Sequence, residues 1–123
     1  IVTTSRASIN DIVSFQCCRY LKKILLPSTL KVIEKYAFLR CSNLTEINLP
    51  DNLTSIGEEA FSGCSSLTEI NLPDNLTSIG GFAFYGCSSL TGIHLPANLT
   101  SIGRAPFEYM PCFSSTNDKL YFW

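Results

Sequence analysis

Six cysteines are the side chains of this sequence whose chemistry would be easiest to recognise. They could form a disulfide framework or bind a metal. No two of them stand in a C-x-x-C pair, the spacing typical of structural zinc sites, so zinc is poorly supported. Cys18, Cys41, Cys64 and Cys87 recur every 23 residues, whereas Cys17 and Cys112 fall outside that spacing.

Catalysis has little support elsewhere in the chain. His94 is the single histidine, and no motif marks one of the many serines or threonines as its nucleophile. Asp51 and Asp74 stand 23 residues apart, but Ala97 ends their series, and calcium needs six or more oxygen ligands. We therefore predict a protein that is not an enzyme and has no catalytic residue, cofactor site or metal site.

Composition indicates a folded protein with no affinity for nucleic acid. The 123 residues are 46% hydrophobic and 15% charged, which argues against disorder. A net charge of −1 gives no basic surface for nucleic acid or anionic lipid. No apolar run approaches the roughly 18 residues of a membrane span, so direct membrane insertion is not expected. The chain begins at Ile1 without a visible targeting signal, and we read it as an excerpt of a longer protein or a processed product.

The regular cysteine spacing is part of a 23-residue repeat. The segment LPDNLTSIG at 49–57 recurs at 72–80, and again as LPANLTSIG at 95–103. Apolar columns follow the same period, for example Phe15, Phe38, Phe61, Phe84, Phe107 and Ile33, Ile56, Ile79, Ile102. One such unit cannot bury its own apolar face, so the repeats must stack as coils around a shared core.

Each repeat predicts one strand and a return path. Residues 67–72 have the form L-x-x-I-x-L, in which Asn71 faces away from Ile70 and Leu72. A turn at 73–75 follows, and 76–79 return along the other side. The segment 80–87 is too short for a full helix, so we expect one helical or 3₁₀ turn with Ala83 and Phe84 facing inward.

These residues resemble the BspA-like leucine-rich repeat family. The pattern LPxxLTSIGxxAFxGCSSLTxI is present at 49–70 and at 72–93. The resemblance implies an α/β repeat solenoid: a right-handed stack with a parallel sheet on the concave face and short helical or 3₁₀ turns opposite. It also implies a cell-surface or secreted protein that adheres to host proteins or to other cells. The family has no catalytic residues to carry over.

The repeat suggests three regions. Residues 1–14 are a ragged N-terminal segment or partial cap, 15–107 form the solenoid, and 108–123 are a degenerate last repeat or C-terminal cap. Pro106 and Met110 break the alanine and cysteine columns at the end of the solenoid. Solenoids need polar caps, so without them we predict end-to-end self-association through open strands.

The same columns explain the cysteines as a ladder of small buried thiols. Parallel coils hold neighbouring Cβ atoms farther apart than a disulfide prefers, which favours thiols over bridges. Cys17 and Cys112, outside the column, are the more reactive thiols by this reasoning. Asn43, Asn52, Asn75 and Asn98 begin N-x-T glycosylation sequences, but three of them share one repeat position that suits a turn.

Outward positions on the predicted strands are the natural place for a protein partner. Glu46 and Glu69 would be like charges on adjacent strands, which either a partner's cation or Lys23 could relieve. The predicted partner-binding residues are Lys22, Lys23, Thr45, Glu46, Asn48, Thr68, Glu69, Asn71, Thr91 and His94, with Leu25 and Gly92 in the same rows.

Other functions remain open at this level. The near-identical central repeats also suit a structural spacer in a longer solenoid, and reduced thiols suit an intracellular interaction scaffold. Tyr36, Phe82 and Tyr85 fall on the side opposite the strands, where exposed aromatic rings could form a lateral contact.

Overall fold

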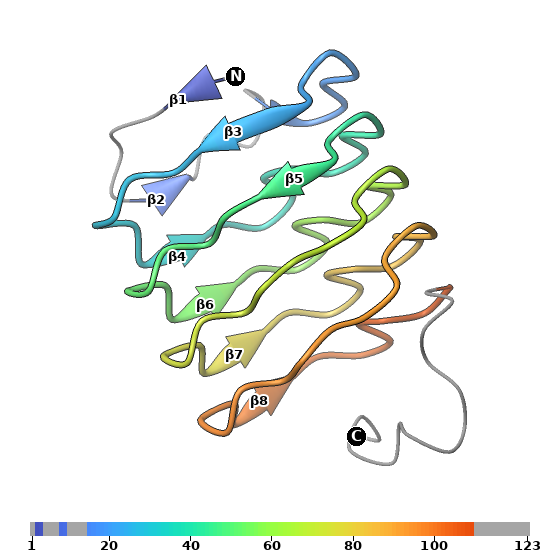
Figure 1. The fold of residues 1–123 in the computed structure, drawn as a ribbon. Coiled ribbons are helices and arrows are strands. Elements are labelled where there is room, and N and C mark those ends of the chain that lie inside the picture. The colour runs from blue at the N-terminus through green and yellow to red at the C-terminus, as the bar shows by residue number, and fades with distance from the viewer. Residues whose placement is uncertain (1, 4–7, 10–14, 110–123) are drawn as a thin grey trace.

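The chain forms a stack of flat coils whose strands are all parallel (Figure 1). The computed structural model describes residues 2–3, 8–9 and 15–109. The strands are β1 (Val2–Thr3), β2 (Ser8–Ile9), β3 (Lys23–Leu25), β4 (Val32–Ile33), β5 (Glu46–Ile47), β6 (Ser55–Ile56), β7 (Ser78–Ile79) and β8 (Ser101–Ile102).

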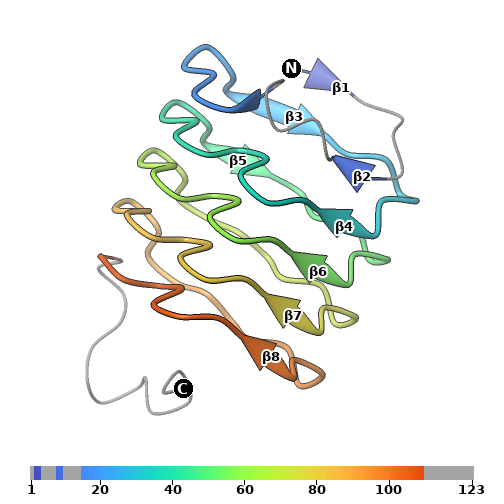
Figure 2. The same ribbon diagram turned by 180° about the vertical axis from the view of Figure 1, so that it is seen from behind.

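Two sheets, rather than the single predicted one, run along the stack. The order β1-β3-β5 builds the first sheet, which an isolated parallel bridge between Glu46 and Glu69 continues. The return segments form a second sheet of order β2-β4-β6-β7-β8, which lies in front in Figure 2. Its register of Ser55 with Ser78, and of Ser78 with Ser101, keeps the 23-residue period. The return segments are therefore extended, and the sheet that they form spans more coils than the first sheet does.

The first sheet ends earlier than the repeat predicts. The predicted strand at 67–72 is reduced to the isolated bridge at Glu69, and no strand forms in the equivalent residues 90–95. Gly92 takes the place that Glu46 and Glu69 hold in the preceding coils. Glycine is unfavourable in strands because it loses the most backbone entropy and has no side chain to pack.

Consecutive tight turns replace the helical or 3₁₀ turn that was expected between 80 and 87. N–H groups here donate to carbonyls three residues earlier, as from Tyr85 to Phe82 at 3.2 Å. Phe82 has a φ of 56° and Gly86 one of 73°, and such left-handed residues interrupt any helix. Ala83 and Phe84 are nevertheless fully buried, as predicted.

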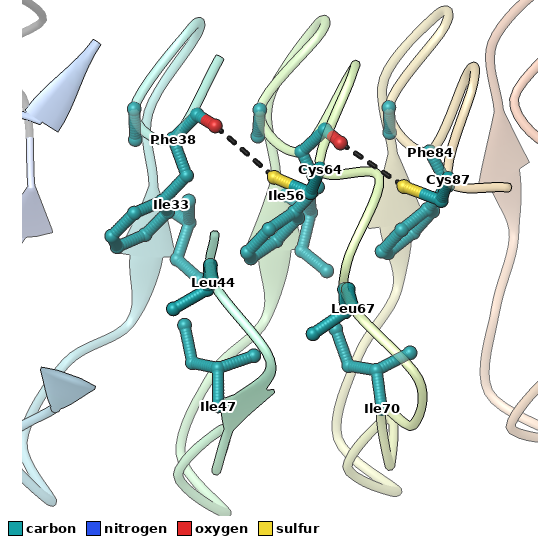
Figure 3. Close-up of a cluster of buried hydrophobic side chains, with 14 of the residues drawn as sticks. Ile33, Phe38, Leu44, Ile47, Ile56, Cys64, Leu67, Ile70, Phe84 and Cys87 are labelled. Atoms are coloured by element: carbon teal, nitrogen blue, oxygen red, sulfur yellow. Dashed lines mark hydrogen bonds between the residues drawn. The ribbon is translucent and has the colours of Figure 1, made fainter. Parts of the chain in front are cut away.

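The core is a set of columns, each of one side-chain type (Figure 3). The ring of Phe61 lies between those of Phe38 and Phe84, with centroids 5.3 and 5.4 Å away. These rings are nearly parallel, with interplanar angles of 10° and 3°. Leu44 and Leu67 form a second column, fully buried like the phenylalanines. Apolar side chains are thus buried chiefly against their equivalents in neighbouring coils, which is the source of most of the stability.

Backbone hydrogen bonds join the coils on both sides of the core. On the sheet side, the N–H of Gly80 donates to the carbonyl of Ile56 in the preceding coil, at 2.8 Å. On the turn side the direction reverses, and the N–H of Phe61 donates to the carbonyl of Ala83 in the following coil, also at 2.8 Å. Each coil therefore satisfies its peptide groups through both neighbours.

The predicted end regions are partly outside the described residues. β1 and β2 belong to the segment 1–14, and they extend the two sheets by pairing with β3 and β4. Of the segment 108–123, the described residues are 108 and 109. Cys112 therefore lies outside the described residues.

Close packing of the coils makes a clear prediction for Gly80. A Cβ atom added there would lie 2.4 Å from the backbone nitrogen of Glu58, a contact that requires the coils to shift. We expect Gly80→Ala to lower the free energy of unfolding by roughly 1–3 kcal/mol, the usual cost of overpacking. Urea unfolding followed by circular dichroism measures this loss.

Gly92→Ala is the matched control, because a Cβ at Gly92 meets no atom within 4 Å. It should change the unfolding free energy by less than about 0.5 kcal/mol. Equal stability of the two variants would contradict the close approach of neighbouring coils at Gly80.

Candidate functional site

The predicted partner-binding residues lie along the first sheet and the two coils that follow β5, at a surface that we call the strand face. Nine of these residues are exposed, and Lys23 is half-exposed because it pairs with Glu46. A shallow hollow of about 220 Å³ lies in the middle of this face. Six of the predicted residues line it: Thr45, Glu46, Asn48, Thr68, Glu69 and Asn71.

Two neighbouring coils supply these six residues at equivalent positions. The backbone bridge between Glu46 and Glu69 sets the two carboxylates side by side. The alternation along each strand segment turns Ile47 and Ile70 into the core, so the glutamates and asparagines point to solvent. Thr91 and His94 are exposed in the next coil but do not line the hollow.

The charges of the strand face are unevenly paired. Lys23 Nζ lies 3.1 Å from Glu46 Oε2, whereas no cationic group of the described chain lies within 4.0 Å of the Glu69 carboxylate. Asn71 Nδ2 approaches Glu69 Oε1 at 3.5 Å, too long for a strong hydrogen bond. Of the two interpretations considered for these like charges, lysine pairing holds for Glu46. Glu69 stays available to a cation from outside.

The described residues offer the strand face little catalytic or metal-binding chemistry. His94 is exposed and stands outside the hollow. Across the described part of the chain, no three histidine, cysteine, aspartate or glutamate residues gather as a metal would require. No helix among the described residues is long and apolar enough to cross a membrane.

The cysteine column is the predicted ladder of buried thiols. Cys41, Cys64 and Cys87 are fully buried, Cys18 is half-buried, and all four are free, as is the exposed Cys17. Each buried thiol donates to a phenylalanine carbonyl of the preceding coil, at 3.2 Å from Cys64 to Phe38 (Figure 3). Burial raises the pKa of Cys41 to about 11 and that of Cys87 to about 12. These thiols are therefore structural and unreactive at neutral pH.

Asparagines of the shared turn position form a second ladder. The side-chain amides of Asn52, Asn75 and Asn98 donate to backbone carbonyls of the preceding coil at 2.9, 2.9 and 3.0 Å. Hydroxyls of Thr54, Thr77 and Thr100 donate in the same way at 3.1, 3.1 and 3.2 Å. The N-x-T sequences therefore recur because the asparagine and the threonine of each one donate hydrogen bonds to the preceding coil.

A second hollow, of about 510 Å³, lies on the turn segments. Tyr36, Phe82 and Tyr85, predicted as exposed aromatics, are half-buried, and Phe82 and Tyr85 line this hollow. The sequence interpretation did not single out Arg40, Glu59 and Glu108, which also line it. The available signal was the column Arg40, Gly63, Gly86, Tyr109, in which two glycines interrupt large side chains.

The stacked coils, parallel sheets and repeat columns define a leucine-rich repeat solenoid. The BspA type leucine-rich repeat region matches residues 8–118 in six copies. The chain therefore belongs to the BspA type leucine-rich repeat family. No curated protein matches the chain in sequence.

Solved structures of bacterial proteins share this fold. The leucine-rich repeat protein of T. pallidum is 34% identical over 91% of this chain and 49% of its own, with a TM-score of 0.77. One from Bacteroides ovatus is 41% identical over 84% of this chain and 25% of its own, with a TM-score of 0.70. The pneumococcal vaccine antigen PcpA is 31% identical over 76% of this chain and 23% of its own, with a TM-score of 0.71. The chain spans about half the length of these relatives or less.

Alkaline pH should destabilise the protein through its buried thiols. The unfolded chain ionises a cysteine near pH 9.0, whereas the folded chain keeps Cys87 protonated up to about pH 12. Stability is thus fully present below about pH 9 and is lost as the pH rises through this window, by roughly 1.4 kcal/mol per pH unit for each such thiol. Urea unfolding of wild type and Cys87→Ala across this range measures the difference.

Cys87→Ala should lower overall stability but flatten its decline at alkaline pH. Cys17→Ala is the control, because Cys17 is exposed and this variant removes a thiol without removing a buried one. Identical pH dependence in wild type and Cys87→Ala would contradict a buried, protonated thiol.

Proposed function

We propose that this chain is a non-catalytic protein-binding module of a surface or secreted adhesion protein, and that the strand face is its binding site. The observation that carries the proposal is the hollow between two coils, in which the Glu69 carboxylate has no cationic partner among the described residues. Lys22, Lys23, Thr91 and His94 extend the site to either side of this hollow.

The strand face is suited to a polar, reversible contact. Exposed carboxylate, amide and hydroxyl groups line its hollow, and they can exchange water for groups of a partner. A lysine or arginine of the partner would pair with Glu69 and relieve its repulsion from Glu46. An exposed pair contributes only about 0–1 kcal/mol, so charge favours orientation and association rate more than affinity.

Family membership supports the cellular setting. A structural relative is a vaccine antigen of pneumococcus, which fits a protein accessible from outside the cell. The other relatives are also bacterial leucine-rich repeat proteins longer than this chain. We extend the surface or secreted setting to the parent of this chain on that basis.

Charge reversal on the strand face tests the proposal. We expect Glu46→Lys combined with Glu69→Lys to abolish binding to a protein partner, because both carboxylates of the hollow become repulsive to its cations. Wild type and variant are compared by surface plasmon resonance on an array of purified extracellular host proteins. Circular dichroism should show an unchanged fold, since both side chains are exposed.

Asp51→Lys combined with Asp74→Lys is the matched control. It reverses the same number of charges in the same two coils, at exposed turn positions where the following repeat carries Ala97. Binding that survives in the strand-face variant would refute the strand face as the site. A folded wild type that binds no protein of the array would instead favour a spacer in a longer solenoid.

A further inference from the structure

The turn segments carry a groove that the proposed function does not use. It has a volume of about 510 Å³ and crosses several coils between Leu39 and Glu108. The turn segments follow the second sheet in each coil and lie on the side shown in Figure 2. The groove therefore lies apart from the hollow on the strand face.

The absence of a side chain at Gly86 leaves open space in this groove. Arg40, Gly63, Gly86 and Tyr109 occupy equivalent positions of successive coils, all with positive φ. Arg40 and Tyr109 carry large side chains, and the side chain of Arg40 lies against Gly63, where an added Cβ would be 3.2 Å from Arg40 Cγ. A Cβ at Gly86 would meet nothing closer than 3.8 Å, so the space above it is free.

Aromatic rings form one wall of the groove. Phe82 and Tyr85 pack edge to face with centroids 5.6 Å apart, and Tyr85 and Tyr109 do the same at 5.2 Å. These contacts hold the half-buried rings of Phe82 and Tyr85, which line the groove, in defined orientations, and Tyr109 is an exposed neighbour outside the lining. Partial desolvation raises the pKa of Tyr85, as do the nearby Tyr109 and Glu108.

Glu59 and Glu108 give the groove its acidic character. Together with Arg40 they carry a net charge of −1, and these three make no ion pair within 4.0 Å in the described part of the chain. The backbone N–H groups of Gly63 and Gly86 are not free to bind a ligand, because they already donate to the carbonyls of Tyr85 and Glu108. A ligand must therefore be recognised by the side chains.

The chain itself shows which group suits such a surface. In the neighbouring coil, Lys35 Nζ lies 5.0 Å from the ring centroid of Tyr36 and 3.4 Å from Glu58 Oε1. Tyr36 stands at the repeat position of Glu59 and Phe82, so this cation, ring and carboxylate occupy the same side of the solenoid. The groove has the rings and carboxylates of this arrangement, and its own cation, Arg40, makes no ion pair within 4.0 Å with Glu59 or Glu108.

We propose that this groove binds an arginine side chain of a protein partner. The planar guanidinium stacks on the ring of Phe82 or Tyr85, and its N–H groups donate to the carboxylate of Glu59 or Glu108. Arginine is favoured over lysine because its flat, weakly hydrated group can stack and pair at once. The site lies apart from the strand face, so it can be tested separately from the proposed function.

A titration followed by NMR tests the site directly. The probe is a short blocked peptide with one arginine flanked by glycines, added to the isotope-labelled chain. We expect saturable shifts of the amide resonances of Gly63, Gly86 and Tyr85, weakened by added salt. The same peptide with citrulline, which is uncharged and of similar shape, should bind about tenfold more weakly, a difference of roughly 1.4 kcal/mol.

Two variants test separately the charge of the groove and the open space in it. Glu59→Gln with Glu108→Gln should weaken arginine binding while leaving the groove open. Gly86→Arg should abolish it by filling and recharging the groove, and the backbone tolerates arginine at this repeat position because Arg40 adopts a φ of 57° there. Gly92→Arg adds the same charge on the strand face, where Gly92 is exposed, and should leave peptide binding unchanged.

Absence of saturable shifts at these three amides would overturn the proposal, as would equal binding of the citrulline peptide. Shifts that persist in a folded Gly86→Arg variant would also overturn it, because the peptide would then lie elsewhere. Loss of peptide binding in Glu46→Lys with Glu69→Lys would place the peptide on the strand face and refute the groove.

Discussion

Contact between successive coils is the interaction on which this protein depends. The apolar side chains of a coil pack against their equivalents in the adjacent coils, as the ring of Phe61 does against Phe38 and Phe84. Backbone hydrogen bonds run toward the preceding coil along the sheets and toward the following coil along the turns. Stability is consequently a sum over neighbouring coils, and a substitution at one repeat position acts mainly on the coils that it touches.

Each coil must match its neighbours to pack against them, and this explains why many polar side chains that could react or bind have a structural role. A cysteine thiol, an asparagine amide and a threonine hydroxyl in each repeat donate to carbonyls of the preceding coil, as Cys64, Asn75 and Thr77 do. Their regular spacing reflects the 23-residue period of the coil. Function is then left to positions that face solvent, where the repeat varies from coil to coil, as at Glu69 and Gly92 on the strand face or Gly63 and Arg40 on the turn side.

The sequence predicted correctly those features that depend only on the 23-residue period. The columns headed by Phe38, Cys41 and Leu44 are buried as predicted, and the predicted strand-face residues are accessible to solvent. It was wrong where hydrogen bonding between coils overrides local pattern. The segment around Ser78 pairs into a second sheet, and the segment around Phe82 forms tight turns in place of a helical one. The predicted strand at 67–72 keeps only one bridge, and the equivalent segment around Gly92 forms no strand.

The amino-acid sequence by itself determined the repeat, the family, the inward columns and the outward rows, because a fixed period allows few ways to bury apolar side chains. Tertiary structure decided which outward-facing side chains of different coils lie close together. It placed Lys23 against Glu46 and left Glu69 without a cation, and it assembled a groove from Arg40, Glu59 and Tyr85 in three different coils. A period gives the position of each side chain within its coil, whereas a site depends on distances across coils, and only the stacked backbone sets those distances.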